Sequence, residues 1–352
     1  MPELTVVPAP TRRVRFTDTQ VEMSHGAGGK ASRRLVEGLI APAFANPVLE
    51  PLADAAIFAL GATRVATTAD GYVVRPLRFP GGSIGELAVN GTVNDLAVSG
   101  ARATALMASF ILEAGLSAEV LREEVAAMAA AAQRANVPIV GGDTKVVEHG
   151  LCDGMYIATF GIGVVDERVT LDPRLVRPGD QVLLSGPIGD HGITILLARG
   201  ELDLEADLRS DTRSVWPFAE RLIVTCGNDL RWMRDPTRGG VATALNELAR
   251  ACDLGVVLRE EDVPLRREVR GACEVLGLDP LHIANEGQLL AIVAAASADA
   301  ALAALRSVPG GEQAHMIGEI SSDHPGTVVG VTPYGGKRAI DMLVGDPLPR
   351  IC

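Results

Sequence analysis

Two stretches of alternating strand-like and helix-like segments, separated by a polar linker, constrain most strongly what this chain can fold into. In the first half, short apolar runs at 64–70 and 137–143 each end in an aspartate and flank an Ala-rich segment at 117–136. These patterns are typical of strands and of a helix. A proline-containing stretch at 165–180 interrupts them, and the alternation resumes with a helical pattern at 241–252. The sequence therefore predicts two domains that both mix strands and helices.

The composition allows a large core and argues against two classes of partner. The chain has 352 residues, of which 47% are hydrophobic and 3% aromatic, so Ala, Val, Leu and Ile must form its core. A net charge of −12 argues against nucleic-acid and anionic-membrane partners, because both require a basic surface. No signal-peptide pattern is present, and the apolar stretch at 289–305 is interrupted by Asp299 and too short for a membrane helix. We therefore expect a cytoplasmic protein.

The cysteines divide into two groups. Those of the first group are widely spaced, without a CxxC pair, and are expected to be reduced core residues: Cys152, Cys226, Cys252 and Cys273. Cys352 ends the chain in "PLPRIC", where prolines at 347 and 349 favour extended backbone and disfavour a helix or sheet. An ordinary role as a small core residue does not explain this thiol.

Isolated aspartates occur beside small or apolar residues at four places in the first half. A carboxylate buried in such a setting must be paired or bound to a cation, and hard oxygen ligands suit Mg²⁺ shared with phosphates. Each aspartate alone could instead cap a helix or form a turn. Together they predict a magnesium and nucleotide site made of Asp54, Asp70, Asp95 and Asp143.

The Gly-rich stretch "SHGAGGKAS" at 24–32 allows three interpretations. A P-loop is disfavoured because Ser24 occupies the position of the first glycine and Ala31 follows the lysine. The glycine spacing also fits a loose dinucleotide fingerprint, but an isolated match of this kind is weak. A tight turn that caps a helix over 31–40 fits equally well.

Two motifs in the second half favour anion binding and acid–base chemistry. Asp235 and Arg238 lie in "RDPTRGG" directly before a helical pattern, where backbone N–H groups and an arginine form a ready anion site. Simple helix capping is the alternative. Glu286 lies in "ANEG" ahead of a strongly apolar strand, and a desolvated carboxylate of this kind is a general-base candidate with a raised pKa.

Taken together, these motifs resemble the HypE family, the carbamoyl dehydratases of nickel–iron hydrogenase maturation. The Gly and Asp motifs are shared by the wider superfamily of aminoimidazole ribonucleotide synthetase (PurM)-like ATP enzymes, whereas the terminal "PRIC" is particular to this family. The segments that carry the resemblance run nearly end to end: "SHGAGGK", "GTVNDLAVSGA", "GGDTKVV", "SGPIGDHG", "RDPTRGG", "RGACEVLGLDPLHIANEG" and "PRIC".

The resemblance implies a two-domain α+β fold of the PurM type. An N-terminal segment at 1–40 with the Gly-rich loop precedes an ATP-binding domain at 41–165, whose strands are expected to form a β-barrel across a homodimer interface. A C-terminal α/β domain follows at 178–340. A flexible tail at 341–352 ends in the cysteine that holds the substrate.

The resemblance also implies a reaction. The carbamoyltransferase HypF is expected to transfer a carbamoyl group to Cys352, from which this chain removes water with ATP and Mg²⁺, leaving a thiocyanate for the HypC–HypD complex. The family places Glu286 as the base for the N–H proton and Lys145 as the cation beside the developing negative charge, and the reverse division of roles stays open. Asn94 and Thr144 are expected as neighbours of the nucleotide.

Two other functions remain open from the sequence. Another PurM-like synthetase, such as an amidine cyclase or a selenophosphate synthetase, would use the same scaffold, although the latter needs a reactive cysteine or selenocysteine that the loop at 24–30 lacks. The second is a maturation scaffold that binds ATP without catalysis.

Overall fold

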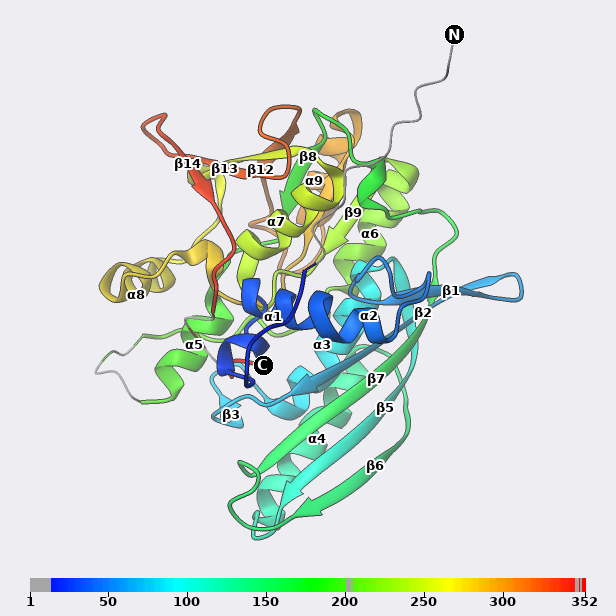
Figure 1. The fold of residues 1–352 in the computed structure, drawn as a ribbon, viewed down its shortest axis with the longest axis vertical. Helices are drawn as coiled ribbons and strands as arrows, with labels where there is room; N and C mark the ends of the chain where they lie inside the picture. The colour runs from blue at the N-terminus through cyan, green and yellow to red at the C-terminus, as the bar shows by residue number, and fades with distance from the viewer. Residues whose placement is uncertain (1–13, 201–203, 205, 346–347, 349) are drawn as a thin grey trace.

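Two β-sheets, one in each half of the chain, organise the structure (Figure 1). This computed structural model describes residues 14–200, 204, 206–345, 348 and 350–352. The start of the predicted N-terminal segment, and Pro347 and Pro349 of the predicted tail, lie outside the described residues.

The first sheet has the strand order β1-β2-β7-β5-β6 among the described residues, and only β5 and β6 run parallel. Its central strand β7 alternates strictly: Ile157 and Thr159 point into the core, whereas Phe160, Ile162 and Val164 point outward. This period of two is what a strand with one covered face requires. The strands are β1 Ala56–Leu60, β2 Thr63–Tyr72, β5 Ala101–Glu113, β6 Ile139–Val147 and β7 Met155–Val165.

Helices α3 (Ile84–Val98) and α4 (Ala118–Arg134) cover the inner face of this sheet. α3 is buried along nearly its whole length, because small or apolar side chains occur on all its sides. It also contacts α6 and β9 of the second half, so it joins the two halves. The short elements before it are η1 Met23–Gly26, α1 Lys30–Leu35, η2 Val36–Ile40, α2 Ala41–Ala43, β3 Arg78–Phe79 and β4 Gly82–Ser83.

The second sheet has the order β14-β13-β10-β12-β8-β11-β9, and only β10 and β13 run parallel among its described pairs. Both faces are buried: Val182 and Leu184 of β8 pack on the side of α7, and Leu183 packs on the side of α6 and α9. The strands are β8 Gln181–Leu184, β9 Leu230–Arg234, β10 Gly255–Arg259, β11 Leu290–Val293, β12 His315–Ser321, β13 Val328–Val331 and β14 Lys337–Ile340.

The helices of the second half complete its two outer layers. None of the helices in the described part of the chain has both the length and the apolar character needed to cross a bilayer. The helices are η3 Pro173–Leu175, α5 Asp190–Ala198, α6 Trp216–Cys226, η4 Gly227–Asp229, α7 Gly240–Cys252, η5 Glu260–Asp262, α8 Arg267–Leu276, η6 Pro280–His282, η7 Ala295–Ser297 and α9 Ala298–Arg306.

The two-domain α+β architecture agrees with the sequence-based prediction, but the structure does not confirm three finer expectations. The described strands of the first sheet form an open sheet and no closed barrel. Antiparallel pairing prevails in the second sheet, so the expected α/β domain is α+β by strand direction. The expected flexible tail is not confirmed either, because Leu348 and Ile351 are buried and their apolar side chains belong to a hydrophobic cluster.

Candidate active site

A cavity of about 250 Å³ lies where α3, β2, the start of α7 and the end of the chain meet. These segments lie up to about 300 positions apart in the sequence. The fold nevertheless brings most of the predicted site residues to the lining of this cavity. The predicted residues that line it are Asp54, Asp70, Asp95, Asp235, Arg238, Glu286 and Cys352.

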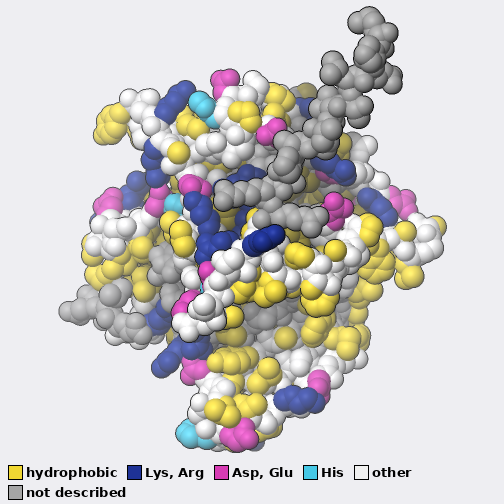
Figure 2. Space-filling model, in the orientation of Figure 1, with side chains coloured by type: hydrophobic (Ala, Val, Ile, Leu, Met, Phe, Trp, Pro, Cys, Tyr) yellow, Lys and Arg dark blue, Asp and Glu magenta, His cyan; other side chains and the backbone are white. Residues whose placement is uncertain are grey.

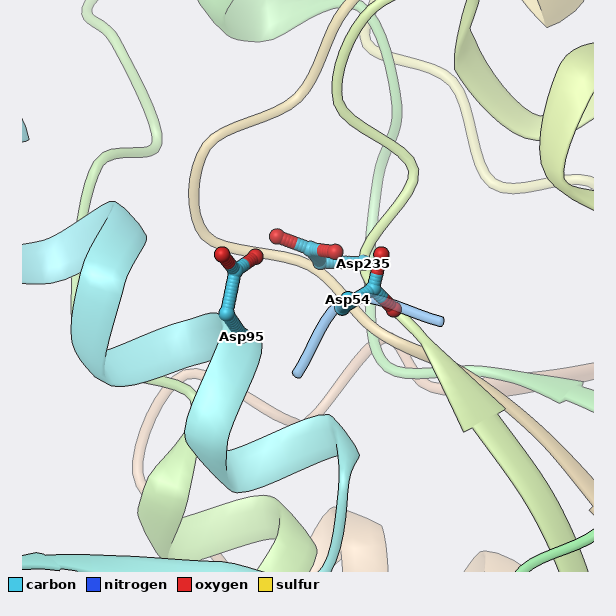
Figure 3. A group of neighbouring side chains, drawn as sticks. All are labelled: Asp54, Asp95 and Asp235. Atoms are coloured by element: carbon cyan, nitrogen blue, oxygen red, sulfur yellow. The ribbon is translucent and has the colours of Figure 1, made fainter. Parts of the chain in front are cut away.

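Three carboxylates in this cavity face one another. Asp95 comes from α3, Asp54 from the loop before β1 and Asp235 from the residue after β9, and Figure 3 shows them converging. One oxygen of each lies within 4.8 Å of the others. Sequence analysis assigned Asp235 to an anion site, whereas the structure places it among the acidic residues.

Desolvation and mutual repulsion disfavour the charged forms of these three groups. Desolvation raises the pKa of Asp54 to about 6 and that of Asp235 to about 7. The pKa of Asp95 also lies well above its usual value, through desolvation and then through the charge of Asp235. Three carboxylates held together against desolvation and mutual repulsion are typical of a cation site, because a bound cation removes the repulsion.

Two charged residues that sequence analysis missed flank this group. Arg234 donates to Asp54 over 2.9 Å and to Glu247 over 3.0 Å. Burial alone would lower the pKa of Arg234, but the surrounding carboxylates raise it above its usual value. The signal available in the sequence was an arginine directly before Asp235 at the end of an apolar strand, where a charge needs a partner.

Glu286 and Cys352 line the same cavity. The side chain of Glu286 is buried, and its Oε1 has no hydrogen-bond partner among the described residues. Desolvation raises the pKa of Glu286 well above its usual value, and Asp235 adds to the shift. An unpartnered buried carboxyl that faces a cavity is available to exchange a proton with a ligand.

Arg238 is the cation beside the end of the chain. The negative charge of Cys352 is the largest of the influences that raise the pKa of Arg238 above its usual value. Arg350, which is closer to Cys352 in the sequence, instead pairs with Asp153 over 2.7 Å. The first turn of α7 also lines the cavity, with Gly240 and Thr243, as the anion-site interpretation of this motif requires.

The structure does not bring four predicted residues to this cavity. Asp143, Thr144 and Lys145 lie on the exposed edge strand β6, where Lys145 pairs with Asp143 over 2.8 Å. Asn94 is buried behind the cavity: its side chain donates to the carbonyls of Arg213 and Glu286 and accepts from the N–H of Val215, so it joins the two halves.

A second cavity of about 530 Å³ adjoins the first and shares Asp54, Arg234 and Arg238 with it. Much of its wall is apolar, with Leu52, Trp232 and other side chains. The Gly-rich loop borders it, and the loop is the cap of α1, as one interpretation predicted. The first N–H groups of α1 donate to the carbonyls of Leu343 and Val344, so they are not free for a phosphate.

Comparisons with known proteins identify the family. The AIR synthase related protein families match both halves, the N-terminal domain over residues 52–165 and the C-terminal domain over 177–331. A carbamoyl dehydratase HypE from Bradyrhizobium diazoefficiens is 48% identical over 341 residues, which are 97% of this chain and 99% of that protein. The chain belongs to the HypE family.

Solved structures of the HypE family agree with this assignment. In the crystal structure of a HypE–HypF complex, the matching chain is 41% identical, with a TM-score of 0.83 over 88% of this chain and 99% of that one. A HypE solved in complex with ATP is 45% identical, with a TM-score of 0.78 over 95% of this chain and 100% of that one. The PurM-like α+β fold of the HypE family therefore extends over nearly the whole chain.

Proposed function

We propose that the cavity around Cys352 is where this member of the HypE family, an ATP-dependent carbamoyl dehydratase of hydrogenase maturation, removes water from a carbamoyl group on its own terminal cysteine. One observation supports this most strongly: Cys352 lies in the same cavity as the three converging aspartates and Glu286, whose Oε1 has no hydrogen-bond partner among the described residues. A substrate attached to Cys352 would lie beside an acid–base residue and a cation site, so the reaction would be effectively unimolecular.

Mg²⁺ fits the donor set of this cavity. Asp54, Asp95 and Asp235 supply hard oxygen atoms close enough to share one ion. Their raised pKa values show that the ionised carboxylates are unfavourable until a cation binds. Asp70, which also belongs to the predicted acidic set, lines the same cavity. These carboxylates would hold Mg²⁺, which would supply positive charge to offset the negative charge of the phosphates during phosphoryl transfer.

We place the nucleotide across the two adjoining cavities. The larger one has the apolar lining that a base and a sugar need, and the smaller one has the acidic residues and Arg238 that phosphates with Mg²⁺ need. Because the two cavities share Arg238, this residue would contact the phosphates and the tail at once. Such an arrangement sets the γ-phosphate beside the substrate.

The chemistry assigns a role to each group near Cys352. An amide oxygen is a poor leaving group, so ATP is used to phosphorylate it, and the oxygen then leaves as part of phosphate. The carbamoyl nitrogen loses both of its protons: the first as its oxygen is phosphorylated, and the second to Glu286 as phosphate leaves and the C≡N bond forms. Arg238, already beside the charge of Cys352, stabilises negative charge on the departing oxygen. The product is a thiocyanate on the sulfur.

Asp143 and Lys145 require a second copy of the chain. The outer face of the first sheet exposes apolar side chains along β5 and β7, such as Met107, Phe160 and Ile162, and Asp143 and Lys145 of β6 lie on the same face (Figure 2). A contiguous apolar face of this kind is typical of an interface. We propose that two chains pair through this face as a homodimer, which would bring Asp143 and Lys145 of β6 to the nucleotide and tail of the partner.

The partners follow from the same reaction. HypF would supply the carbamoyl group to the tail, and a HypC–HypD complex would accept the cyano group, all in the cytoplasm. Both steps require the tail to leave the cavity, because Cys352 is half-buried there.

ATP turnover separates this proposal from its alternatives. We expect the full chain to hydrolyse ATP when its tail has been carbamoylated by HypF, and to be nearly inactive when Cys352 is replaced by alanine under the same conditions. Phosphate release is the measurement. Binding of ATP without tail-dependent turnover would favour a non-catalytic scaffold, and turnover driven by a free small substrate would favour another PurM-like synthetase.

A further inference from the structure

His191 of α5 holds the backbone of the tail. It belongs to the motif "SGPIGDHG", which the reaction described above does not use. Its side chain is fully buried, and its Nε2 lies 2.6 Å from the carbonyl oxygen of Ile351, one residue before the substrate cysteine. A carbonyl oxygen only accepts, so Nε2 is the protonated nitrogen.

A directional chain of hydrogen bonds fixes that tautomer. The N–H of Thr212 donates to Ser210 Oγ over 3.1 Å, which leaves the Ser210 hydroxyl proton for His191 Nδ1 at 2.8 Å. Burial lowers the pKa of His191, so the ring stays neutral and keeps its one proton on Nε2. Phe79 packs edge-on against the ring at 5.6 Å between centroids.

Other groups hold the tail in the same manner. The N–H of Val73 donates to the terminal carboxylate of Cys352 over 3.0 Å, and the carbonyl of Arg350 accepts from the N–H of Arg75 over 3.3 Å and from Arg199 over 3.0 Å. These hydrogen bonds all end on main-chain oxygen atoms, which are the same whatever group the sulfur bears.

The surface of α5 is shaped to receive the tail. A Cβ atom at Gly192 would lie 3.2 Å from Leu348 Cδ1 and 2.6 Å from Ile283 Cγ2, so the glycine allows the close approach of the tail. Leu348 and Ile351 pack in one cluster with Ile193 of the same helix. The bound position of the tail is therefore specified by backbone and apolar contacts together.

We propose that His191 is a positioning residue which, with Arg199 and the N–H groups of Val73 and Arg75, forms a tail clamp that docks the terminal segment whether Cys352 is free or modified. This inference rests on the proposed function for its consequence: the clamp favours dehydration, which needs the docked tail, and opposes carbamoyl transfer, which needs the released tail. Weakening the clamp should move the two half-reactions in opposite directions.

The first test does not depend on the reaction. We expect His191→Leu to increase the alkylation rate of Cys352 by iodoacetamide about 2- to 10-fold, the effect of losing one hydrogen bond. His191→Gln keeps an N–H donor and should stay within about twofold of the wild type. His149→Leu, a change at an exposed histidine, is the matched surface control, and Cys352→Ala gives the background from the other cysteines.

The second test measures both half-reactions on the intact full-length chain. Loss of the donor in His191→Leu should speed carbamoyl transfer by HypF and slow the ATP-dependent loss of water. Arg199→Leu, which removes a second donor, should act in the same direction if the buried His191 variant folds poorly.

Two outcomes would overturn the clamp. One is an unchanged alkylation rate in both His191→Leu and Arg199→Leu, and the other is an equal increase in His191→Gln and His191→Leu. If alkylation changes as expected but neither half-reaction is detected, the clamp stands and the proposed reaction fails instead.

Discussion

Two acidic places with similar local sequence have opposite environments in this molecule. Asp95 and Asp235 lie in a desolvated cavity beside the end of the chain, whereas Asp143 lies on an exposed edge strand and pairs with Lys145, two residues along the same strand. Both places combine an aspartate with small neighbours, so sequence alone assigned Asp95 and Asp143 to one site. The difference teaches that a single chain supplies the cavity, the tail and most of the predicted acidic residues. Asp143 and Lys145 of β6 lie outside that cavity, which is why we propose that they act on a second chain.

The energetic consequence of the two environments differs as well. The pKa of Asp143 is lowered, chiefly by the hydrogen bond from Lys145, so this carboxylate is stable without a cation. The pKa values of Asp54 and Asp235 are raised by desolvation, so these groups favour either a proton or a cation. Only the buried group is therefore poised to bind a cation within one chain.

The largest effect is expected within the cavity. Glu286→Gln should leave ATP binding and carbamoyl transfer intact but slow dehydration by roughly 10²–10⁴, the usual contribution of a positioned acid or base. Intact-protein mass spectrometry over time measures that rate, with Glu319→Gln as an exposed control. Dehydration at the wild-type rate would remove Glu286 from the mechanism.

The acidic residues on the two sides of the comparison should differ in their effect on nucleotide affinity. Asp235→Asn is expected to weaken Mg-ATP binding by at least roughly 10- to 100-fold, as losses at metal sites do. Asp143→Asn should weaken it less, and only if the chain is dimeric, because we propose that Asp143 acts on the partner's site. Calorimetry with Mg²⁺ measures both. An unchanged affinity for Asp143→Asn in the dimer would separate β6 from the nucleotide.

Mixing two impaired variants, at an ATP concentration too low for either to turn over alone, sharpens the same comparison. Asp95→Asn damages the cavity of its own chain, whereas Asp143→Asn is expected to damage the cavity of its partner. Mixed dimers then contain one intact site, and an equimolar mixture that exchanges subunits freely should recover roughly a quarter of the wild-type activity. Recovery of no activity, with mixed dimers demonstrated by tagging, would contradict a shared site.

The smallest expected effect is on thermal stability. Asp54 and Asp235 have raised pKa values in the folded chain, so their protonation stabilises it at low pH, and this contribution is lost as the pH rises through about 6 to 7. Mg²⁺ should restore it where the carboxylates are ionised. We expect Mg²⁺ to raise the Tm by a few degrees at pH 8 and hardly at pH 5. An equal shift at both pH values would contradict a cation bound by these residues.

Much of this site could be predicted from the sequence because its motifs combine charged side chains with glycines and apolar runs. Asp54, Asp70, Asp95 and Glu286 all line the expected cavity. In contrast, Asp235 joins the acidic residues only because the end of β9 lies close to α3 in the fold. No local sequence pattern encodes the distance between these two elements.

The docking of the tail could not be predicted for a related reason. Its prolines argue against a helix or sheet, and the flexibility expected of the segment came from the family resemblance, so neither indicates where the tail binds. The structure instead buries Leu348 and Ile351 against residues more than 60 positions away. A tail can lack secondary structure and still have one bound position, because its hydrogen bonds come from the domain that it contacts.

The central claim is that the terminal cysteine is the site of the chemistry, and mass spectrometry of the intact chain tests it most directly. After incubation with HypF and its substrates, the tail peptide that contains Cys352 should gain one carbamoyl group. Addition of ATP with Mg²⁺ should then remove the mass of one water from the same peptide. Modification at Cys152, Cys226, Cys252 or Cys273 instead, or loss of the water without ATP, would contradict the account.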